Sequence, residues 1–218
     1  MDYLEILFYT LVAYVIGSIP TSIWLGRFRY GIDIREHGYG NASHTNVHHV
    51  LGPRAGLFVQ AFDVLKGFVA ARLALYVHHT YGIFTEMEYP LLMLSFGLAA
   101  TLGHILPVFA GFRGGKGYHV VLGVLVAVHP IATLIFTACS LLIYLIFRYP
   151  HLAYVAGALA LSVATLWQGN RLFGDLRLPM LVFGMSTSLM LFFTHREEIR
   201  GLFAHYLQPI QRPYRRVR

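Results

Sequence analysis

Long runs of apolar residues with almost no charge dominate this sequence of 218 residues and restrict the folds available to it. Hydrophobic residues make up 56% of the chain and charged residues only 12%, whereas a soluble domain carries about 25% charged residues. A helical run of ~20 apolar residues matches the hydrocarbon thickness of a bilayer. The composition therefore predicts an all-α, polytopic membrane protein.

The apolar runs predict about seven transmembrane helices. They lie at residues 3–26, 54–79, 89–111, 118–129, 131–147, 151–168 and 178–194. Segment 118–129 is short, covering roughly half of the hydrocarbon core at ~1.5 Å per residue, which predicts a half-helix or a re-entrant piece. We expect residues 1–205 to form a single membrane-embedded domain and residues 206–218, rich in Pro and Arg, a basic cytoplasmic tail.

The loop charges predict the orientation. If the N-terminus lies outside, thirteen of the seventeen Lys and Arg residues fall inside, which is typical of the cytoplasmic face. The C-terminus is then cytoplasmic, and we expect the chain in the inner membrane of the cell. Loops 27–53 and 112–117 and the start of the tail meet at this face. Since the net charge of +7 lies in short loops and the tail, it indicates membrane orientation and no nucleic-acid partner.

The first polar loop is glycine-rich and reads GYGNASHTNVHHVLG over residues 38–52. Gly38 and Gly40 allow a tight fold with exposed N–H groups. Asn41, Thr45 and Asn46 add short hydrogen-bonding side chains. Such groups suit an anion such as phosphate, and the equally weighted alternative is a polar turn between two spans.

The second polar loop, GHILPVFAGFRGGKG, covers residues 103–117. Gly114, Gly115 and Gly117 surround Lys116, which predicts a phosphate grip. The motif is not a nucleotide P-loop, because its glycine spacing is one residue short and no Ser or Thr follows the lysine. The alternative is a basic turn that simply follows the charge rule for cytoplasmic loops.

Two further features place charge near these loops. His195 begins the polar end of the last span, in THREEIRGL over residues 194–202, and either joins the same pocket or only marks the helix end at the interface. Asp63 and Lys66 stand at i,i+3 inside the second span. Ionisable groups within a membrane usually pair or face a cavity, so we expect an ion pair that faces the bundle interior.

Six motifs occur in an order that resembles a known family. They are IGSIPTS, D-I-R-E-x-G-x-G-N with T-N-V, FDVLKG, LGH with P-V-F, GF-R-GGKG, and H-R-E with I-R-G-L, spread over residues 16–202. Together they resemble the acyl-phosphate-dependent glycerol-3-phosphate acyltransferases of bacteria, the PlsY type. The resemblance implies a seven-helix membrane fold and acyl transfer from acyl phosphate to glycerol 3-phosphate, which yields lysophosphatidate for phospholipid biosynthesis. The implied partners are the lipid bilayer and these two substrates.

The resemblance also implies the site residues. The expected catalytic residues are Lys116, His195 and His104. The expected substrate- and phosphate-binding residues are Gly38, Gly40, Asn41, Thr45, Asn46, Lys66, Gly114, Gly115 and Gly117. Lys116 and the glycine amides would hold phosphate and stabilise developing charge. His195, or a phosphate oxygen of the substrate, would accept the proton of the attacking hydroxyl.

Several positions depart from the family pattern, and three of them bear most on the chemistry. Tyr39 stands where the family usually has Ser, His49 where it has Arg, and Glu198 where it has Asn. His49 lacks the planar fork with which arginine grips phosphate, and Glu198 brings a negative charge toward a phosphorylated substrate. The alternative function is therefore an inactive member of this fold. Such a protein would serve as an accessory subunit of a larger membrane complex, or as a lipid or pigment binder.

The twelve histidines suggest a competing idea. His44 and His48 stand at i,i+4, which on a helix places both rings on one face, as metal sites require. No carboxylate completes an evident ligand set, and the single cysteine, Cys139, lies deep in an apolar run. We therefore expect neither a metal nor a cofactor.

Overall fold

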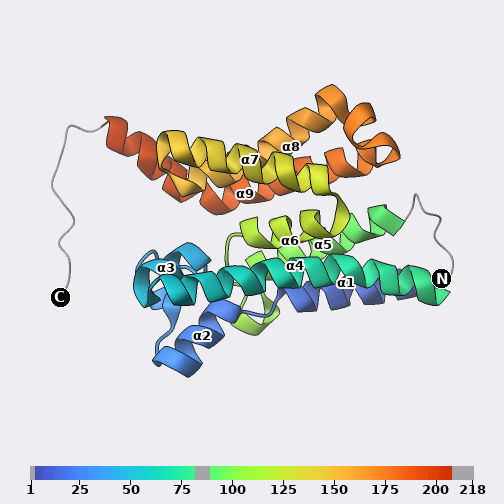
Figure 1. Ribbon diagram of the computed structural model, residues 1–218. Coiled ribbons are helices and arrows are strands. Elements are labelled where there is room, and N and C mark those ends of the chain that lie inside the picture. Colours follow the sequence, from blue (N-terminus) through green and yellow to red (C-terminus); the bar gives the residue numbers. More distant parts are fainter. Residues whose placement is uncertain (1–2, 82–88, 208–218) are drawn as a thin grey trace.

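In the computed structural model, residues 3–81 and 89–207 are described, and every regular element among them is a helix (Figure 1). The α-helices are α1 (Tyr3–Gly17), α2 (Thr21–Tyr30), α3 (His44–Leu51), α4 (Pro53–Tyr81), α5 (Tyr89–Ile105), α6 (Tyr118–Val128), α7 (Pro130–Phe147), α8 (Pro150–Leu172) and α9 (Arg177–Leu207). Short 3₁₀ turns are η1 (Ile34–Glu36), η2 (Val108–Ala110) and η3 (Gly174–Leu176). The all-α prediction is confirmed.

The predicted membrane segments all appear as helices. Among the described residues, five stretches are long and apolar enough to cross a bilayer: Leu4–Tyr30, Tyr89–Ala110, Pro130–Phe147, Pro150–Gln168 and Gly174–Gly201. α6 is an apolar helix of only 11 residues, as the short segment predicted. α4 has 29 residues, enough length to span, but buries the charged Asp63 and Lys66. The polytopic membrane fold is confirmed, and the direction in which it crosses the membrane stays a prediction.

The boundaries differ from the predicted ones at both ends of the chain. The segment expected as one helix over residues 3–26 is broken, because α1 ends at Gly17 and α2 begins at Thr21. Pro20 lies at this break and has no backbone N–H to continue a helix. At the other end, α9 runs to Leu207, well past the expected end at residue 194. The predicted tail 206–218 therefore falls almost entirely outside the described residues.

The helices form two groups with α5 and α6 between them (Figure 1). α8 packs against both α7 and α9 in one group, whereas α4 packs against α5 and α6, and α1 against α5. α2, α3 and the C-terminal part of α9 lie at the end of the bundle opposite the N-terminus (Figure 1). The polar loops are thereby gathered at one end.

Close contact between α4 and α6 brings their backbones together. A Cβ added to Gly67 would lie 2.1 Å from the carbonyl oxygen of Val120, and one added to Gly123 would lie 1.9 Å from that of Val64. Helices in membranes associate through such small residues, which permit close backbone approach. This crossing holds the beginning of α6 beside the charged middle of α4.

Candidate active site

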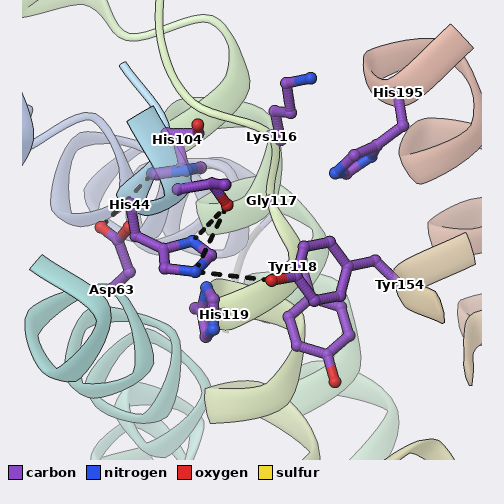
Figure 2. Close-up of a pocket in the computed structure, with 11 residues that line it drawn as sticks. His44, Asp63, His104, Lys116, Gly117, Tyr118, His119, Tyr154 and His195 are labelled. Carbon is purple, nitrogen blue, oxygen red and sulfur yellow. Dashed lines mark hydrogen bonds and ion pairs between the residues drawn. The ribbon is translucent and has the colours of Figure 1, made fainter. Parts of the chain in front are cut away.

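A narrow cavity lies where the polar loops meet the helix ends (Figure 2). Its lining residues are Ser43, His44, Thr45, Asp63, His104, Lys116, Gly117, Tyr118, His119, Tyr154 and His195. All three predicted catalytic residues are among them, and so are two of the predicted phosphate-binding residues, Thr45 and Gly117. The helix packing thus brings together residues that lie more than 150 positions apart in the sequence.

Lys116 supplies a cation at this cavity, directly before the start of α6. Its Nζ donates a hydrogen bond to Oε1 of Glu198 on α9. Burial lowers the pKa of Lys116, and the adjacent Glu198 carboxylate opposes that shift. Gly117, with a φ of 95°, is the N-cap of α6, and the first residues of that helix line the cavity. A helix N-terminus carries partial positive charge, so together with the ammonium it favours an anion.

Gly114 and Gly115 support the site in a different way from the predicted one. Their N–H groups donate to the carbonyl oxygens of Ile105 and His104, at 3.2 and 3.0 Å. A Cβ added to Gly115 would lie 2.2 Å from Nε2 of His104. These glycines let the loop fold directly against the His104 ring, and their amides are already engaged within the protein.

His195 faces the cavity from α9 (Figure 2). Its side chain is buried, and Nδ1 lies 2.8 Å from the carbonyl oxygen of Leu191. A carbonyl only accepts hydrogen bonds, so Nδ1 carries the proton and Nε2 keeps a lone pair. The ring is therefore equipped to take a proton from a group bound in the cavity.

Asp63 and Lys66 form the predicted ion pair. Lys66 Nζ lies 2.8 Å from Oδ1 of Asp63, and both side chains are at most 6% exposed. Lys66 also donates to the carbonyl oxygen of Ile19, at 3.1 Å. Nδ1 of His104 lies 3.6 Å from the same Asp63 oxygen. The pair lines a narrow neighbouring cavity, together with Gly114 and Gly115, and anchors α4 to α5 and to the α1–α2 break.

Four predicted phosphate-binding residues line neither cavity. They are Gly38, Gly40, Asn41 and Asn46. Asn46 is fully buried, and its Nδ2 donates to the carbonyl oxygens of Ile34, His37 and Asn41. Its Oδ1 accepts from the backbone N–H of Tyr39, at 2.7 Å. Asn46 thus ties the first loop together and holds the start of α3, with Thr45, at the cavity.

The positions that depart from the family pattern make contacts of their own. The Tyr39 and His49 rings stack on each other, with centroids 5.1 Å apart and planes at 30°. Glu198 pairs with Lys116, and the hydroxyl of Tyr149 donates to the backbone carbonyl oxygen of Glu198. The Glu198 carboxylate therefore binds Lys116, the lysine that the sequence predicts to hold phosphate.

The two polar loops are joined by Arg35. Its guanidinium pairs with Asp33 at 2.7 Å and donates to the carbonyl oxygen of Ala110 at 2.8 Å. The same contact with Arg35 holds the pKa of the Asp33 carboxyl well below its usual range. This bridge connects the loop before α3 to the loop that carries Lys116.

Rings that sequence reasoning did not assign to the site line much of it. His44 lies 4.0 Å from His119 between centroids, and Tyr118 stacks on Tyr154 at 4.1 Å. Burial lowers the pKa of His44 to about 4, so this ring is neutral at pH 7. Tyr154 has one sequence signal, a hydroxyl about one turn after the start of a largely apolar helix. Within residues 3–81 and 89–207, no three His, Cys, Asp or Glu residues are grouped as a metal site requires.

A wider groove of about 330 Å³, lined by both polar and apolar side chains, adjoins the cavity. It shares His44, Tyr118, His119 and Tyr154 with the cavity, and extends over α7 to Thr137, Ser140, Leu141 and Tyr144. Leu141 and Tyr144 belong to the exposed apolar surface of α7. The cavity therefore continues sideways toward a surface that a membrane would cover.

Comparisons with known proteins agree with one another. A family model described as glycerol-3-phosphate acyltransferase matches residues 7–205. A glycerol-3-phosphate acyltransferase of Chlorobium phaeobacteroides is 37% identical over 214 residues, covering 88% of this chain and 91% of the relative. A glycerol-3-phosphate acyltransferase of Chlorobaculum tepidum is 39% identical over 212 residues, covering 89% of this chain and 91% of the relative.

Solved structures resemble the whole fold. A crystal structure of PlsY (YgiH), an integral membrane glycerol 3-phosphate acyltransferase, in its glycerol 3-phosphate form, has a TM-score of 0.77 and 33% identity. A second crystal structure of PlsY (YgiH), in the lysophosphatidic acid form, has a TM-score of 0.73. Each match covers 92% of this chain and 92% of the chain in the solved structure.

Proposed function

The chain belongs to the glycerol-3-phosphate acyltransferase family, and from this premise we propose that it transfers an acyl group from acyl phosphate to a hydroxyl of glycerol 3-phosphate. The product is lysophosphatidate, and the reaction takes place in the cavity lined by Lys116, His104 and His195. The convergence of these three residues on one cavity, beside a groove that reaches the exposed apolar surface of α7, is the observation that carries the proposal.

The groove and the cavity suit the two parts of the donor. An acyl chain would lie in the groove along α7, which adjoins the membrane-facing surface. Its phosphate end would lie in the cavity, near Lys116 and the N-terminus of α6. Both are positive, and a helix N-terminus and an ammonium are common phosphate partners.

The chemical step needs a base and a stabilised leaving group. The hydroxyl oxygen of glycerol 3-phosphate attacks the acyl carbon, while its proton passes to Nε2 of His195 or to a phosphate oxygen. The bond between the acyl carbon and the phosphate oxygen breaks, and inorganic phosphate leaves. Lys116 stabilises the charge that develops on this leaving phosphate. Because acyl phosphate is already activated, no acyl-enzyme intermediate is required.

His104 positions the loop that carries Lys116. Gly115 packs against the His104 ring, and the backbone carbonyl of His104 accepts a hydrogen bond from the Gly115 N–H. Asp63 lies on the other side of the ring and keeps Lys66 paired. We assign Lys66 and Asn46 to holding the site's framework, since their polar atoms already bind protein groups.

The proposal places this end of the bundle in the cytoplasm and the chain in the inner membrane. The loop charges support this orientation, because most Lys and Arg residues fall on the side of the cavity. Residues 1–205 would act as a single membrane-embedded unit. Other subunits of a membrane complex are partners only under the alternative of an inactive fold.

A comparison of Lys116→Ala with Arg113→Ala tests the proposed function. Both residues are basic and belong to one loop, but Arg113 is exposed and lines neither cavity. The purified protein in mild detergent receives acyl phosphate and glycerol 3-phosphate, and phosphate release is followed. We expect turnover that Lys116→Ala abolishes and Arg113→Ala retains. No turnover in the parent protein, together with a stoichiometric partner or pigment, would support the inactive alternative.

A further inference from the structure

In the part of the chain that the structure describes, Glu198 is the counter-ion of Lys116, and this pairing affects how the site receives a phosphate. Among residues 3–81 and 89–207, Glu198 is the only group that accepts a hydrogen bond from Lys116 Nζ. The lysine side chain is 10% exposed and the glutamate 21%, so both are shielded from water. Burying a lysine ammonium without a counter-ion costs folding free energy, and the Glu198 carboxylate offsets that cost.

Glu198 differs from the acidic residue beside it. Glu197 is 67% exposed and pairs with both Arg196 and Arg200. Neither arginine pairs with Glu198, whose carboxylate forms its ion pair with Lys116. The Tyr149 hydroxyl donates to the backbone oxygen of Glu198 and not to the carboxylate. The carboxylate can therefore leave Lys116 without breaking another ion pair among the described residues.

Two anions compete for Lys116 when a phosphate enters the cavity. A carboxylate and a phosphate a few ångströms apart repel each other, by ~3 kcal/mol at 5 Å with an effective dielectric constant of ~20. The ammonium has three N–H donors, and Oε1 of Glu198 accepts one of them.

We propose that Glu198 determines the affinity of this site for phosphate, by acting as an internal anion that an incoming phosphate group displaces from Lys116. The proposal rests on the proposed function, because it takes Lys116 as the residue that holds a substrate phosphate. That phosphate belongs either to acyl phosphate or to glycerol 3-phosphate. Removing the charge of Glu198 strengthens phosphate binding and lowers the KM of whichever substrate contacts Lys116.

Glu198→Gln and its neighbour Glu197→Gln form a matched pair of variants. Both remove one negative charge from the same turn of α9, but only the first removes the counter-ion of Lys116. Binding of inorganic phosphate to the detergent-purified protein is measured by titration calorimetry. We expect Glu198→Gln to lower the Kd for phosphate on the order of ten-fold, which corresponds to about 1.4 kcal/mol. Glu197→Gln should leave it unchanged.

Kinetics then separate the two phosphate sources. If Lys116 holds the donor, Glu198→Gln lowers the KM of acyl phosphate, and if it holds the acceptor, that of glycerol 3-phosphate falls. A purely structural role of Glu198 would change kcat and thermal stability without selectively lowering either KM. Unchanged or weaker phosphate binding in Glu198→Gln would overturn the proposal.

The binding experiment does not depend on turnover. Tighter phosphate binding in a protein that makes no product would uphold the role of Glu198 and reject the proposed function. Turnover in the parent protein, together with unchanged phosphate affinity in Glu198→Gln, would support the proposed function and reject the role of Glu198. Glu198→Asn, which is neutral but shorter, replaces the glutamine variant if that variant does not fold, and Lys116→Met should abolish phosphate binding in either background.

Discussion

Nδ1 of His195 lies 2.8 Å from the carbonyl oxygen of Leu191, and this contact fixes which ring nitrogen carries the proton. The carbonyl accepts, so Nδ1 donates and Nε2 remains an acceptor that faces the cavity. A backbone group one turn earlier in the same helix thereby sets the tautomer. The site gains a base whose Nδ1 is held by this backbone oxygen, with the Thr194 hydroxyl 3.2 Å from the same nitrogen.

Replacing His195 should remove this base. We expect His195→Gln to lower kcat by about 10²- to 10⁴-fold, the usual contribution of a positioned base, with little change in either KM. Steady-state kinetics of phosphate release measure this effect. His37→Gln serves as the control, because His37 is exposed and lines neither cavity. An unchanged kcat in His195→Gln would show that a phosphate oxygen of the substrate takes the proton instead.

Gly115 should tolerate no side chain. Its added Cβ would lie 2.2 Å from Nε2 of His104, so Gly115→Ala must displace either this ring or the loop that carries Lys116. A displacement of ~1 Å in such a site costs about 10²-fold in rate. The matched control is Gly201→Ala, where the added Cβ meets nothing within 4 Å. Equal kcat values for the two variants would contradict the assigned role of Gly115.

Asp63 should matter more to folding than any exposed acidic residue. Asp63→Asn leaves Lys66 buried without its counter-ion, which should lower the free energy of unfolding by about 3–5 kcal/mol. Unfolding in mixed detergent micelles provides the measurement. Lys66→Met in the same chain should restore most of the loss, because it removes the unpaired charge. Strictly additive effects of the two substitutions would show that the ion pair has no energetic coupling.

His44 should make the protein less stable as the pH falls. Burial lowers its pKa in the folded state to about 4 from an ordinary value of 6.5. Between these values the unfolded chain binds a proton that the folded chain does not, so stability rises with pH across this window. His44→Gln should therefore flatten the decline of Tm from pH 6.5 to 4. His48→Gln, one turn later on α3 and exposed, should leave the decline unchanged, and equal slopes in all three proteins would refute this account.

The helices were predictable because long apolar runs have few alternatives to a membrane helix. The short α6 and the Asp63–Lys66 pair were likewise visible as a run of limited length and a charge spacing of i,i+3. The break at Pro20 was missed because residues 3–26 remain apolar across it, and hydropathy alone does not register a lost N–H.

The site was predictable in its motif residues but not in the contacts between them. Lys116, His104 and His195 meet at one cavity, yet the amides of Gly114 and Gly115 bind backbone oxygens. Such engagement depends on how the loop folds against α5, which glycine content does not specify. The pairing of Lys116 with Glu198 joins residues 82 positions apart and follows from the packing of α9, so no local pattern encodes it.

The most direct test of acyl transfer to glycerol 3-phosphate measures the labelled product and the released phosphate in the same reaction. The purified protein is supplied with acyl phosphate and ¹³C-labelled glycerol 3-phosphate, and the products are quantified by mass spectrometry and a phosphate assay. An acyltransferase yields one labelled lysophosphatidate for each phosphate released. Phosphate release without labelled lysophosphatidate, or no reaction at all, would contradict acyl transfer to glycerol 3-phosphate by this chain.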